Sequence, residues 1–388
     1  MIDTIVLTFK QDMFNIMHHD YFSPSTEGLY KPEDYYRLGR RSNMVCKQNP
    51  TPSELKAGIY KPRITVTKRL NRQRQFEITM KIEFSIPKLL FGNNFDELEE
   101  TDFEKVIQKL KYTLRSMGVF VFEYRLINAT VSTIHFGKNI ALIDYTTPYT
   151  YIKILSKANI NQRLDLNQTD FRNEGQSLKY RANSFEIAFY DKIKDIQKAR
   201  VSEKRAEEKD NHIQLNLFKE VKVKEPFEVL RIEIRLNKKQ KLIQILKLIG
   251  IDEPPTFKML FSKSTAQKIL MHYINEIEAS YPKILSYTAT NPKDFLTELI
   301  LHNPRVPPKK ALQMLGLRVF LTENGIRDFR EMFRRQDKTN WYKLQAELKQ
   351  YIYPKQESPL KILRDAIEEF KPLKLVDFKI NSINNNFR

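Results

Sequence analysis

The apolar residues follow two different periods along the chain, and the change between them constrains the fold most. Up to about residue 240, segments such as "MIDTIVLTF", "RITVTKRL" and "FEVLRIEIRL" alternate apolar and polar residues, which is typical of half-buried β-strands. Beyond that point, segments such as "KKQKLIQILKLIG" and "STAQKILMHYINEIEASY" place apolar residues at helical spacing. The sequence predicts an α+β fold, with an antiparallel-sheet domain over residues 1–240 and a mostly α-helical, basic domain over 241–388.

Local signals place elements within the sheet-rich part. "RITVTKRL" and "RQFEITMKIEFSI" form a predicted hairpin around the polar turn at 71–74, and "GQSLKYRANSFEIAFYDK" forms a second one turning at 181–183. Residues 101–118 form a predicted helix that begins with a capping box of Thr101 and Glu104 and ends at Gly118.

The segments after this helix complete the sheet-rich part. Two strands parted near Asn128 are predicted next, and then a short helix with Pro148 in its first turn. Residues 193–224 form a charged excursion that begins as a solvated helix, and an exposed helix face explains this charge run better than a dedicated binding patch.

The charge indicates the partner. A formal net charge of +19 favours a polyanion, and nucleic acid fits better than an anionic membrane because no apolar run approaches the roughly 20 residues of a spanning helix. The first residues lack the apolar stretch of a secretory signal, so we expect a cytoplasmic protein. The single cysteine, Cys46, excludes an intrachain disulfide and a Cys-rich zinc site.

The helical part contains a candidate DNA-binding segment, "PPKKALQMLGLRVFLTENGIRDFREMFRR". It could form a helix-turn-helix, with Gly325 near the second helix and a run of arginines after it: Arg327, Arg330, Arg334 and Arg335. A packed αα-hairpin with a basic outer face is the alternative, and the pattern favours it.

Glycine-rich phosphate loops are absent from the sequence, which has only 10 glycines. The segment "PKLLFGNN", with Lys88, Gly92 and Asn94, predicts a turn in which Gly92 takes an unusual backbone angle and Asn94 caps.

Three strands carry polar side chains in alternate positions. Thr133, His135 and Gly137 share one face of "TIHFG", Tyr190 and Lys192 share one of "IAFYDK", and the third strand, "LRIEIRL", carries Arg231, Glu233 and Arg235. If the strands are neighbours, these groups converge on one surface. The alternatives are a structural histidine and a cross-strand ladder of ion pairs.

Such a surface suits cleavage of a DNA strand by a tyrosine. The hydroxyl attacks a phosphodiester, a divalent cation polarises the phosphate, and cationic side chains hold the strand. His135 and Glu233 are the candidate ligands for Mg²⁺ or Mn²⁺, and Arg231 and Arg235 are candidate DNA contacts.

The chain resembles the gene II/X family of filamentous-phage and plasmid replication proteins, which start rolling-circle replication by nicking one strand. The matching features are "MIDTIVLTF", "IEFSIPKLLFGNN" with the helix after it, "NATVSTIHF", "FYDKI" and "LRIEIRL", in the same order over residues 1 to about 250. The resemblance implies an HUH-like nickase domain whose metal-binding strand is "TIH".

Two departures from the family pattern affect the site. Thr133 and His135 stand where the family typically has an arginine and an aspartate, so the presumed metal ligand changes from a carboxylate to an imidazole. The strand with Arg231, Glu233 and Arg235 carries over, and so does the pair Tyr190 and Lys192. The resemblance also implies a nucleophile between "FYDK" and "RIEIR", where residues 193–232 contain no tyrosine. Either Tyr180 or Tyr190 replaces it, with Tyr180 preferred because it lies near a turn, or the chain binds DNA without nicking it.

The leading expectation is a replication initiation protein of a phage or plasmid that nicks single-stranded DNA at the origin and transfers the strand. The alternative is a non-catalytic origin-binding or regulatory DNA-binding protein of the same ancestry, and an RNA-binding protein is a third class. The expected partners are origin DNA, single-stranded and duplex, and the replication machinery of a bacterial host, with no membrane.

Overall fold

The computed structural model describes most of the chain. The described residues are 1–30, 43–71, 73, 75–142, 146–158, 170–172, 176–200, 228–287, 289, 291–333, 338–354 and 358–375.

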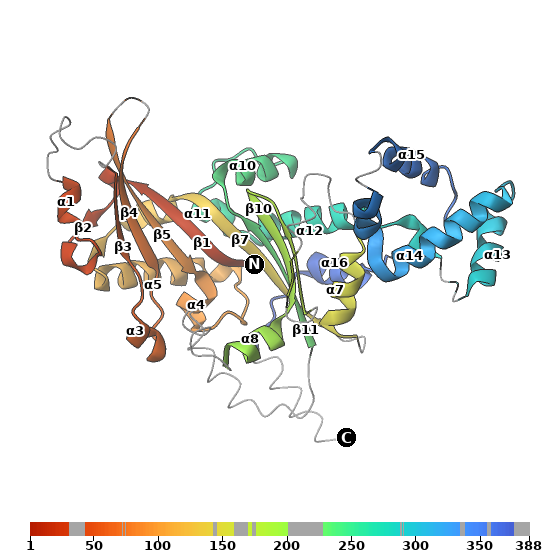
Figure 1. Cartoon of the computed structure of the whole chain (residues 1–388). Coiled ribbons are helices and arrows are strands. Elements are labelled where there is room, and N and C mark those ends of the chain that lie inside the picture. The colour runs from red at the N-terminus through yellow and green to blue at the C-terminus, as the bar shows by residue number, and fades with distance from the viewer. Residues whose placement is uncertain are drawn as a thin grey trace, which may run out of the picture.

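One antiparallel sheet organises the first two thirds of the chain (Figure 1). The described residues give it nine strands in the order β3-β4-β5-β1-β7-β11-β10-β9-β8. In that order the strands are Met44–Gln48, Arg63–Leu70, Phe76–Ser85, Ile2–Lys10, Thr130–Leu142, Glu228–Leu236, Phe185–Asp191, Ser177–Arg181 and Asp170–Arg172. A second, two-stranded sheet pairs β2 (Asn15–Ile16) with β6 (Val119–Phe120). The structure confirms an antiparallel α+β fold.

The helices fall into three groups along the chain. Those before β11 are α1 (Glu27–Tyr30), α3 (Pro52–Lys56), α4 (Ile86–Phe91), α5 (Phe103–Ser116), α6 (Glu123–Ile127), α7 (Pro148–Ser156) and α8 (Lys192–Arg200). Next come α10 (Lys239–Leu248), α11 (Phe257–Leu260) and α12 (Lys263–Ala279). The last are α13 (Pro292–His302), α14 (Pro308–Phe333), α15 (Lys338–Leu348) and α16 (Lys361–Glu369). Within the described ranges, none of these helices has the length and apolarity needed to cross a lipid bilayer.

The large sheet has one covered face and one open face. On β1 the side chains of Ile5, Leu7 and Phe9 are fully buried, while the alternate residues Thr4, Val6 and Thr8 are partly exposed. The buried side joins one hydrophobic core with apolar residues of α5, α10, α12 and α16, which lie along the sheet (Figure 1). We call the other side the open face; it carries the alternate side chains of the strands, and one end of it, at Val229 of β11, packs with Ile196 of α8, Phe95 and Leu375.

The segment around α5 shows two differences from the sequence-based expectations. The predicted helix is present, but Thr101 does not cap it: Glu99 and Asp102 form the capping box, one short helical turn earlier. The segment before Asn128 is not a full strand, because β6 ends at Phe120 and the chain then forms the single helical turn α6. The Asn128 side chain stabilises that turn by donating to the carbonyl oxygen of Tyr124 at 2.8 Å.

The core does not divide at residue 240. Apolar residues of α10, α12 and α16 pack into the core of the sheet, so these helices belong with it. A second core, between residues 284 and 353, joins α13, α14 and α15, and we call this part the helical unit. The expectation was wrong here because an amphipathic helix does not reveal in its sequence which surface it covers.

The candidate DNA-binding segment is a helix that turns sharply. Gly325 lies inside α14 with φ 80°, which glycine adopts without strain, and it divides the element into two packed helices. The turn packs against the end of α7: a Cβ added at Gly325 would lie 3.3 Å from Cα of Lys157. The turn therefore faces the sheet part of the molecule rather than a free surface.

Candidate functional site

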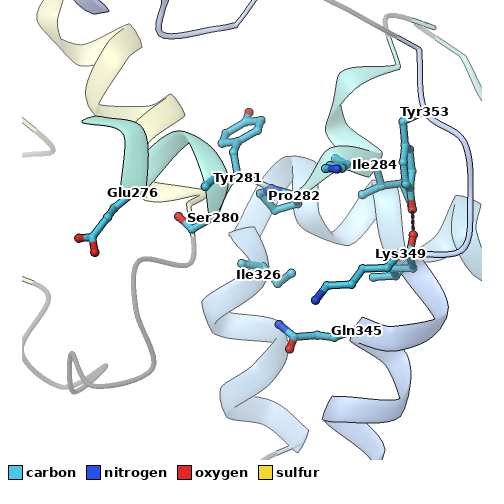
Figure 2. A pocket seen from close by; sticks show the side chains of 12 residues that line it. Glu276, Ser280, Tyr281, Pro282, Ile284, Ile326, Gln345, Lys349 and Tyr353 are labelled. Atoms are coloured by element: carbon cyan, nitrogen blue, oxygen red, sulfur yellow. Dashed lines mark hydrogen bonds between the residues drawn. The ribbon is translucent and has the colours of Figure 1, made fainter. Parts of the chain in front are cut away.

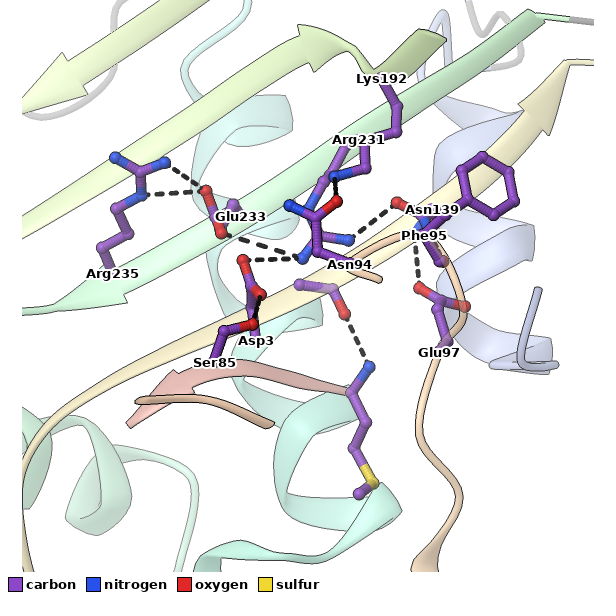
Figure 3. A network of polar contacts seen from close by, with 12 residues as sticks. Asp3, Ser85, Asn94, Phe95, Glu97, Asn139, Lys192, Arg231, Glu233 and Arg235 are labelled. Atoms are coloured by element: carbon purple, nitrogen blue, oxygen red, sulfur yellow. Dashed lines mark hydrogen bonds and ion pairs between the residues drawn. The ribbon is translucent and has the colours of Figure 1, made fainter. Parts of the chain in front are cut away.

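The three polar strands are neighbours at the centre of the large sheet. In the register of β7 and β11, His135 lies opposite Arg235 and Asn139 opposite Arg231. In the register of β11 and β10, Arg235 lies opposite Glu186 and Arg231 opposite Tyr190. Side chains opposite one another share a face, so the strands bring these groups together as the alternation predicted. We call Asp3, Glu186, Arg231, Glu233 and Arg235 the polar cluster; Figure 3 shows Asp3, Arg231, Glu233 and Arg235, and Glu186 accepts from Arg235.

Arg231 is the buried centre of this polar cluster. Only 3% of it is exposed, and its guanidinium lies 3.2 Å from the Asp3 carboxylate and donates to Oδ1 of Asn139 at 2.8 Å. Gly137 makes room for it, because a Cβ at that position would lie 2.7 Å from Nη2 of Arg231. The glycine of "TIHFG" is therefore required by the close approach of an arginine.

Glu233 and Arg235 continue the network toward the surface. Oε2 of Glu233 accepts from Nε and Nη2 of Arg235 at 2.9 and 2.5 Å. Nη1 of Arg235 donates to Glu186 at 2.7 Å, and Glu186 also accepts from Arg181 at 2.7 Å. The predicted ladder of cross-strand ion pairs is present, and its outer members are partly exposed on the open face.

The charges in the polar cluster stabilise one another. Burial alone would raise the pKa of Glu233, but Arg235 and Arg231 outweigh burial, and the pKa lies well below its ordinary value. Burial lowers the pKa of His135, while Glu233 partly opposes this effect. At neutral pH the site therefore contains an ionised carboxylate and a neutral imidazole.

Tyr190 and Lys192 lie at the inner end of the polar cluster. Burial, and then the Glu233 carboxylate, raise the pKa of Tyr190 well above its ordinary value. Lys192 is fully buried, donates to Oδ1 of Asn94 at 2.9 Å, and has its pKa lowered to about 7 by burial and by Arg231. Its Nζ lies 6.0 Å from the centre of the Tyr190 ring, so a weakly basic amine stands beside a protonated phenol.

Tyr190 and His135 occupy opposite ends of the polar cluster. Tyr190 lies in the row of Arg231 and His135 in the row of Arg235, four residues further along β11. At the rise of an antiparallel strand, the two rows are about 13 Å apart. The row of Glu233 lies between the two.

The predicted metal ligands do not form a complete ligand set. Among the described residues, no three His, Cys, Asp or Glu side chains gather closely enough to hold a metal ion. Glu233 already accepts from Arg235 and lies 3.9 Å from Arg231. In this arrangement the residues present do not fit an Mg²⁺ or Mn²⁺ site.

Tyr180, the preferred nucleophile from the sequence, lies on the other face of the sheet. It pairs with Ile187, so its side chain points into the covered side, where it is fully buried. Its hydroxyl donates to the carbonyl oxygen of Leu155 at 2.6 Å, and burial raises its pKa. The proximity of a turn did not place this hydroxyl on the surface, because strand parity decides the face.

The predicted DNA contacts differ in accessibility. Arg231 and Arg327 are 3% and 6% exposed, and the guanidinium of Arg327 lies 4.5 Å from the centre of the Tyr180 ring, so these two arginines make internal contacts instead. Arg235 and Arg330 are partly exposed. Arg334 and Arg335 lie outside the described residues.

The segment "PKLLFGNN" forms the turn that its glycine predicts. Gly92 ends α4 with φ 73°, and its N–H donates to the carbonyl oxygen of Lys88 at 3.1 Å. Lys88 itself is buried. Asn94 does not cap the turn, because its side chain accepts from Lys192; Asn93 accepts instead from the backbone N–H groups of Phe95 and Asp96. The turn therefore supplies, through Asn94, a hydrogen-bond acceptor for Lys192.

Cations and hydroxyls extend over the open face beyond the polar cluster. One row runs across four strands, from Lys47 through Thr65 and Lys81 to Thr8. Lys47 and Lys81 are exposed. Arg63, Lys179 and Arg181 add partly exposed cations on the same face. The open face thus offers cations and hydroxyls over several strands, together with the exposed Glu83, which lies opposite Arg63.

Sequence reasoning missed three members of the network: Asp3, Asn139 and Glu186. Glu186 could have been found, since it alternates with Ala188 and Tyr190 on "FEIAFY". Asp3 and Asn139 approach Arg231 only through the pairing of β1, β7 and β11, which no local pattern specifies.

A cavity of about 490 Å³ lies elsewhere, between the end of α12 and the helical unit (Figure 2). Tyr281, Ile326 and Tyr353 are among its lining residues, and it shares none with the polar cluster. The polar cluster and this cavity are therefore separate sites.

Comparison of the chain with protein-family models, with curated proteins and with solved structures gave no match.

Proposed function

We propose that this chain is a replication initiation protein of a phage or plasmid and that it binds origin DNA on the open face of its sheet. The observation that carries the proposal is the open face, where the exposed Lys47 of β3 and Lys81 of β5 share one side of the sheet with the partly exposed His135 and Arg235. Positively charged side chains release counterions when they contact phosphates, and this effect dominates DNA affinity.

Burial on the opposite face supports this use of the surface. Helices α5, α10, α12 and α16 cover one side of the sheet. On the other side, Ile196 of α8 packs with Phe95, Val229 and Leu375 over one end of β11, while the row from Thr8 to Lys47 stays partly or fully exposed. The polar cluster beneath that surface is internally paired, which fixes Arg235 and Glu186 in one arrangement. A fixed, partly exposed guanidinium loses little freedom when it binds a phosphate.

Strand cleavage with Tyr190 as the nucleophile is the second candidate activity. It would make the chain an HUH-like nickase, as the resemblance implies. The observation that favours it is the position of Lys192 beside Tyr190, with a pKa of about 7. In the reaction, Oη of Tyr190 bonds to phosphorus, the bond from phosphorus to the 3′ oxygen breaks, and the 3′ oxygen takes a proton from water and leaves as a hydroxyl. A partly neutral Lys192 is suited to accept the phenol proton.

The proposed setting is the cytoplasm of a bacterial host, whose replication machinery would extend the 3′ end. The resemblance implies Mg²⁺ or Mn²⁺ for nicking, so the cleavage test includes both ions and an EDTA control.

Supercoiled plasmid carrying the origin is the substrate that separates the two activities. If the chain nicks, denaturing electrophoresis shows a protein-linked 5′ end that is lost in Tyr190→Phe and kept in Tyr180→Phe, because Tyr180 lies on the covered face. A chain that binds the origin but leaves no nick with any divalent ion supports binding alone. The proposal is contradicted if the chain binds origin DNA neither as single strands nor as a duplex.

A further inference from the structure

Exposed aromatic rings and arginines alternate at one end of the sheet. Phe122 and Tyr124 are 50% and 58% exposed, although large aromatic side chains are usually buried. Their ring centres are 5.9 Å apart with an interplanar angle of 28°, and Phe122 meets Phe120 edge to face at 4.9 Å. Contiguous exposed apolar surface of this kind marks an interaction site.

Arginines hold these rings in place. The guanidinium of Arg125 lies 5.5 Å from the centre of the Phe122 ring and 5.6 Å from that of Tyr124, and its Nε donates to the Tyr124 hydroxyl at 2.8 Å. Arg125 also donates to the carbonyl oxygen of Asp12, and Arg115 lies 5.3 Å from the centre of the Phe120 ring. We call Phe120, Phe122 and Tyr124, with Arg115 and Arg125, the aromatic platform.

The aromatic platform borders an open hollow of about 520 Å³. Lys111 and Arg115 line the hollow together with the three rings, and its one carboxylate, Glu123, is paired with Lys111 at 2.7 Å. The hollow therefore has flat apolar walls and an excess of positive charge. A nucleotide has the complementary parts, a flat base and an anionic phosphate.

The aromatic platform lies at the end of the sheet where β1 ends and β7 begins. Helix α6 directly precedes β7, the strand of His135, and Arg125 binds the backbone just after β1. Thr8 and Thr130 are paired at that end of the two strands. The aromatic platform therefore borders the end of the sheet that a DNA strand running along β1 and β7 would pass.

We propose that the aromatic platform stacks the unpaired bases of single-stranded DNA. Base stacking on exposed rings is tolerant of sequence and adds to the contacts of phosphates with cations. Duplex DNA offers no free base faces, so the aromatic platform distinguishes single-stranded from duplex DNA. The inference rests on the proposed DNA-binding function and extends it to the form of DNA that is held.

The test compares strands with and without bases. The full chain is titrated with a fluorescein-labelled oligodeoxythymidylate of about 16 nucleotides, within the range of site sizes for single-strand binding domains, and with an abasic strand of the same length. In Phe122→Ala/Tyr124→Ala, the affinity for oligodeoxythymidylate measured by fluorescence anisotropy falls about 10- to 100-fold, while the affinity for the abasic strand stays unchanged.

Two further variants separate ring loss from misfolding. Phe122→Leu/Tyr124→Leu keeps apolar volume without aromatic faces and gives the same selective loss. Tyr149→Ala/Leu301→Ala removes two other exposed apolar side chains, which are 47% and 73% exposed, and keeps the wild-type affinity for both strands.

The outcomes distinguish this inference from the proposed function. The stacking inference is overturned if the platform variants bind oligodeoxythymidylate as tightly as the wild type. It is also overturned if they lose as much affinity for the abasic strand as for oligodeoxythymidylate. In both cases the proposed DNA binding stands. A wild-type chain that binds neither strand overturns both.

Discussion

Gly137 and Arg231 lie so close across neighbouring strands that a single methyl group at residue 137 would overlap the guanidinium, with Cβ 2.7 Å from Nη2. The arginine cannot move aside without cost, because it is 3% exposed and bound to Asp3 and Asn139. We expect Gly137→Ala to lower the free energy of unfolding by about 2 kcal/mol, as overpacking of a core does. Urea titration followed by circular dichroism measures the change.

The matched control is Gly316→Ala on α14, where nothing lies within 4 Å of an added Cβ. It should keep or slightly raise stability, because alanine favours a helix more than glycine. Equal stability of the Gly137→Ala variant and the wild type would mean that Arg231 is not held as described.

Glu233 makes stability depend on acidic pH. Arg235 and Arg231 hold its pKa below the value of an unfolded chain, so its contribution is present above about pH 4.3 and is lost as pH falls below that value. Glu233→Gln should cost about 3 kcal/mol at pH 7, because the buried Arg231 and the partly exposed Arg235 lose an anionic partner, and it should flatten the loss between pH 4 and 2. The free energy of unfolding across this range is the measurement, with the exposed Glu77→Gln as the control.

Lys192 also makes stability rise with pH, but in the alkaline range. Burial lowers its folded pKa to about 7, whereas an unfolded lysine keeps its proton to about pH 10.4. The unfolded state therefore binds more protons between these values, and stability rises with pH through this contribution. Lys192→Met should remove the rise between pH 7 and 9.5 in the same denaturation experiment. A variant that keeps the rise would place the titrating group elsewhere.

Tyr180 has a structural role. Tyr180→Phe loses the hydrogen bond to the Leu155 carbonyl and should lower the free energy of unfolding by about 1 kcal/mol. Its affinity for origin DNA should stay at the wild-type value, because the residue lies on the covered face. Tyr112→Phe, at a position that is 75% exposed, should change neither quantity. A loss of DNA affinity in Tyr180→Phe, with stability kept, would reverse this assignment.

Local patterns in the sequence predicted which residues share a face, and long-range pairing decided the rest. The alternation of "TIHFG" and "LRIEIRL" correctly grouped His135 with Gly137 and Arg231 with Glu233. The same alternation, counted through the hairpin, puts Tyr180 and Tyr190 on opposite faces, so the nearby turn does not decide where the Tyr180 hydroxyl lies. The role of Asp3 depends on β1 lying beside β7, and a sequence pattern in either strand carries no information on that neighbour.

The central claim is that DNA binds the open face. Lys47→Glu/Lys81→Glu reverses two exposed charges in one row across that face, and Lys239→Glu/Lys268→Glu reverses two exposed charges on helices of the covered side. Both variants change the net charge by the same amount, so only the position differs. The most direct measurement is their affinity for single-stranded origin DNA over a series of salt concentrations. We expect the open-face pair to lose at least about tenfold in affinity and to show a shallower salt dependence, with the helix pair near wild type. Equal losses in the two variants, or a larger loss in the helix pair, would contradict the account.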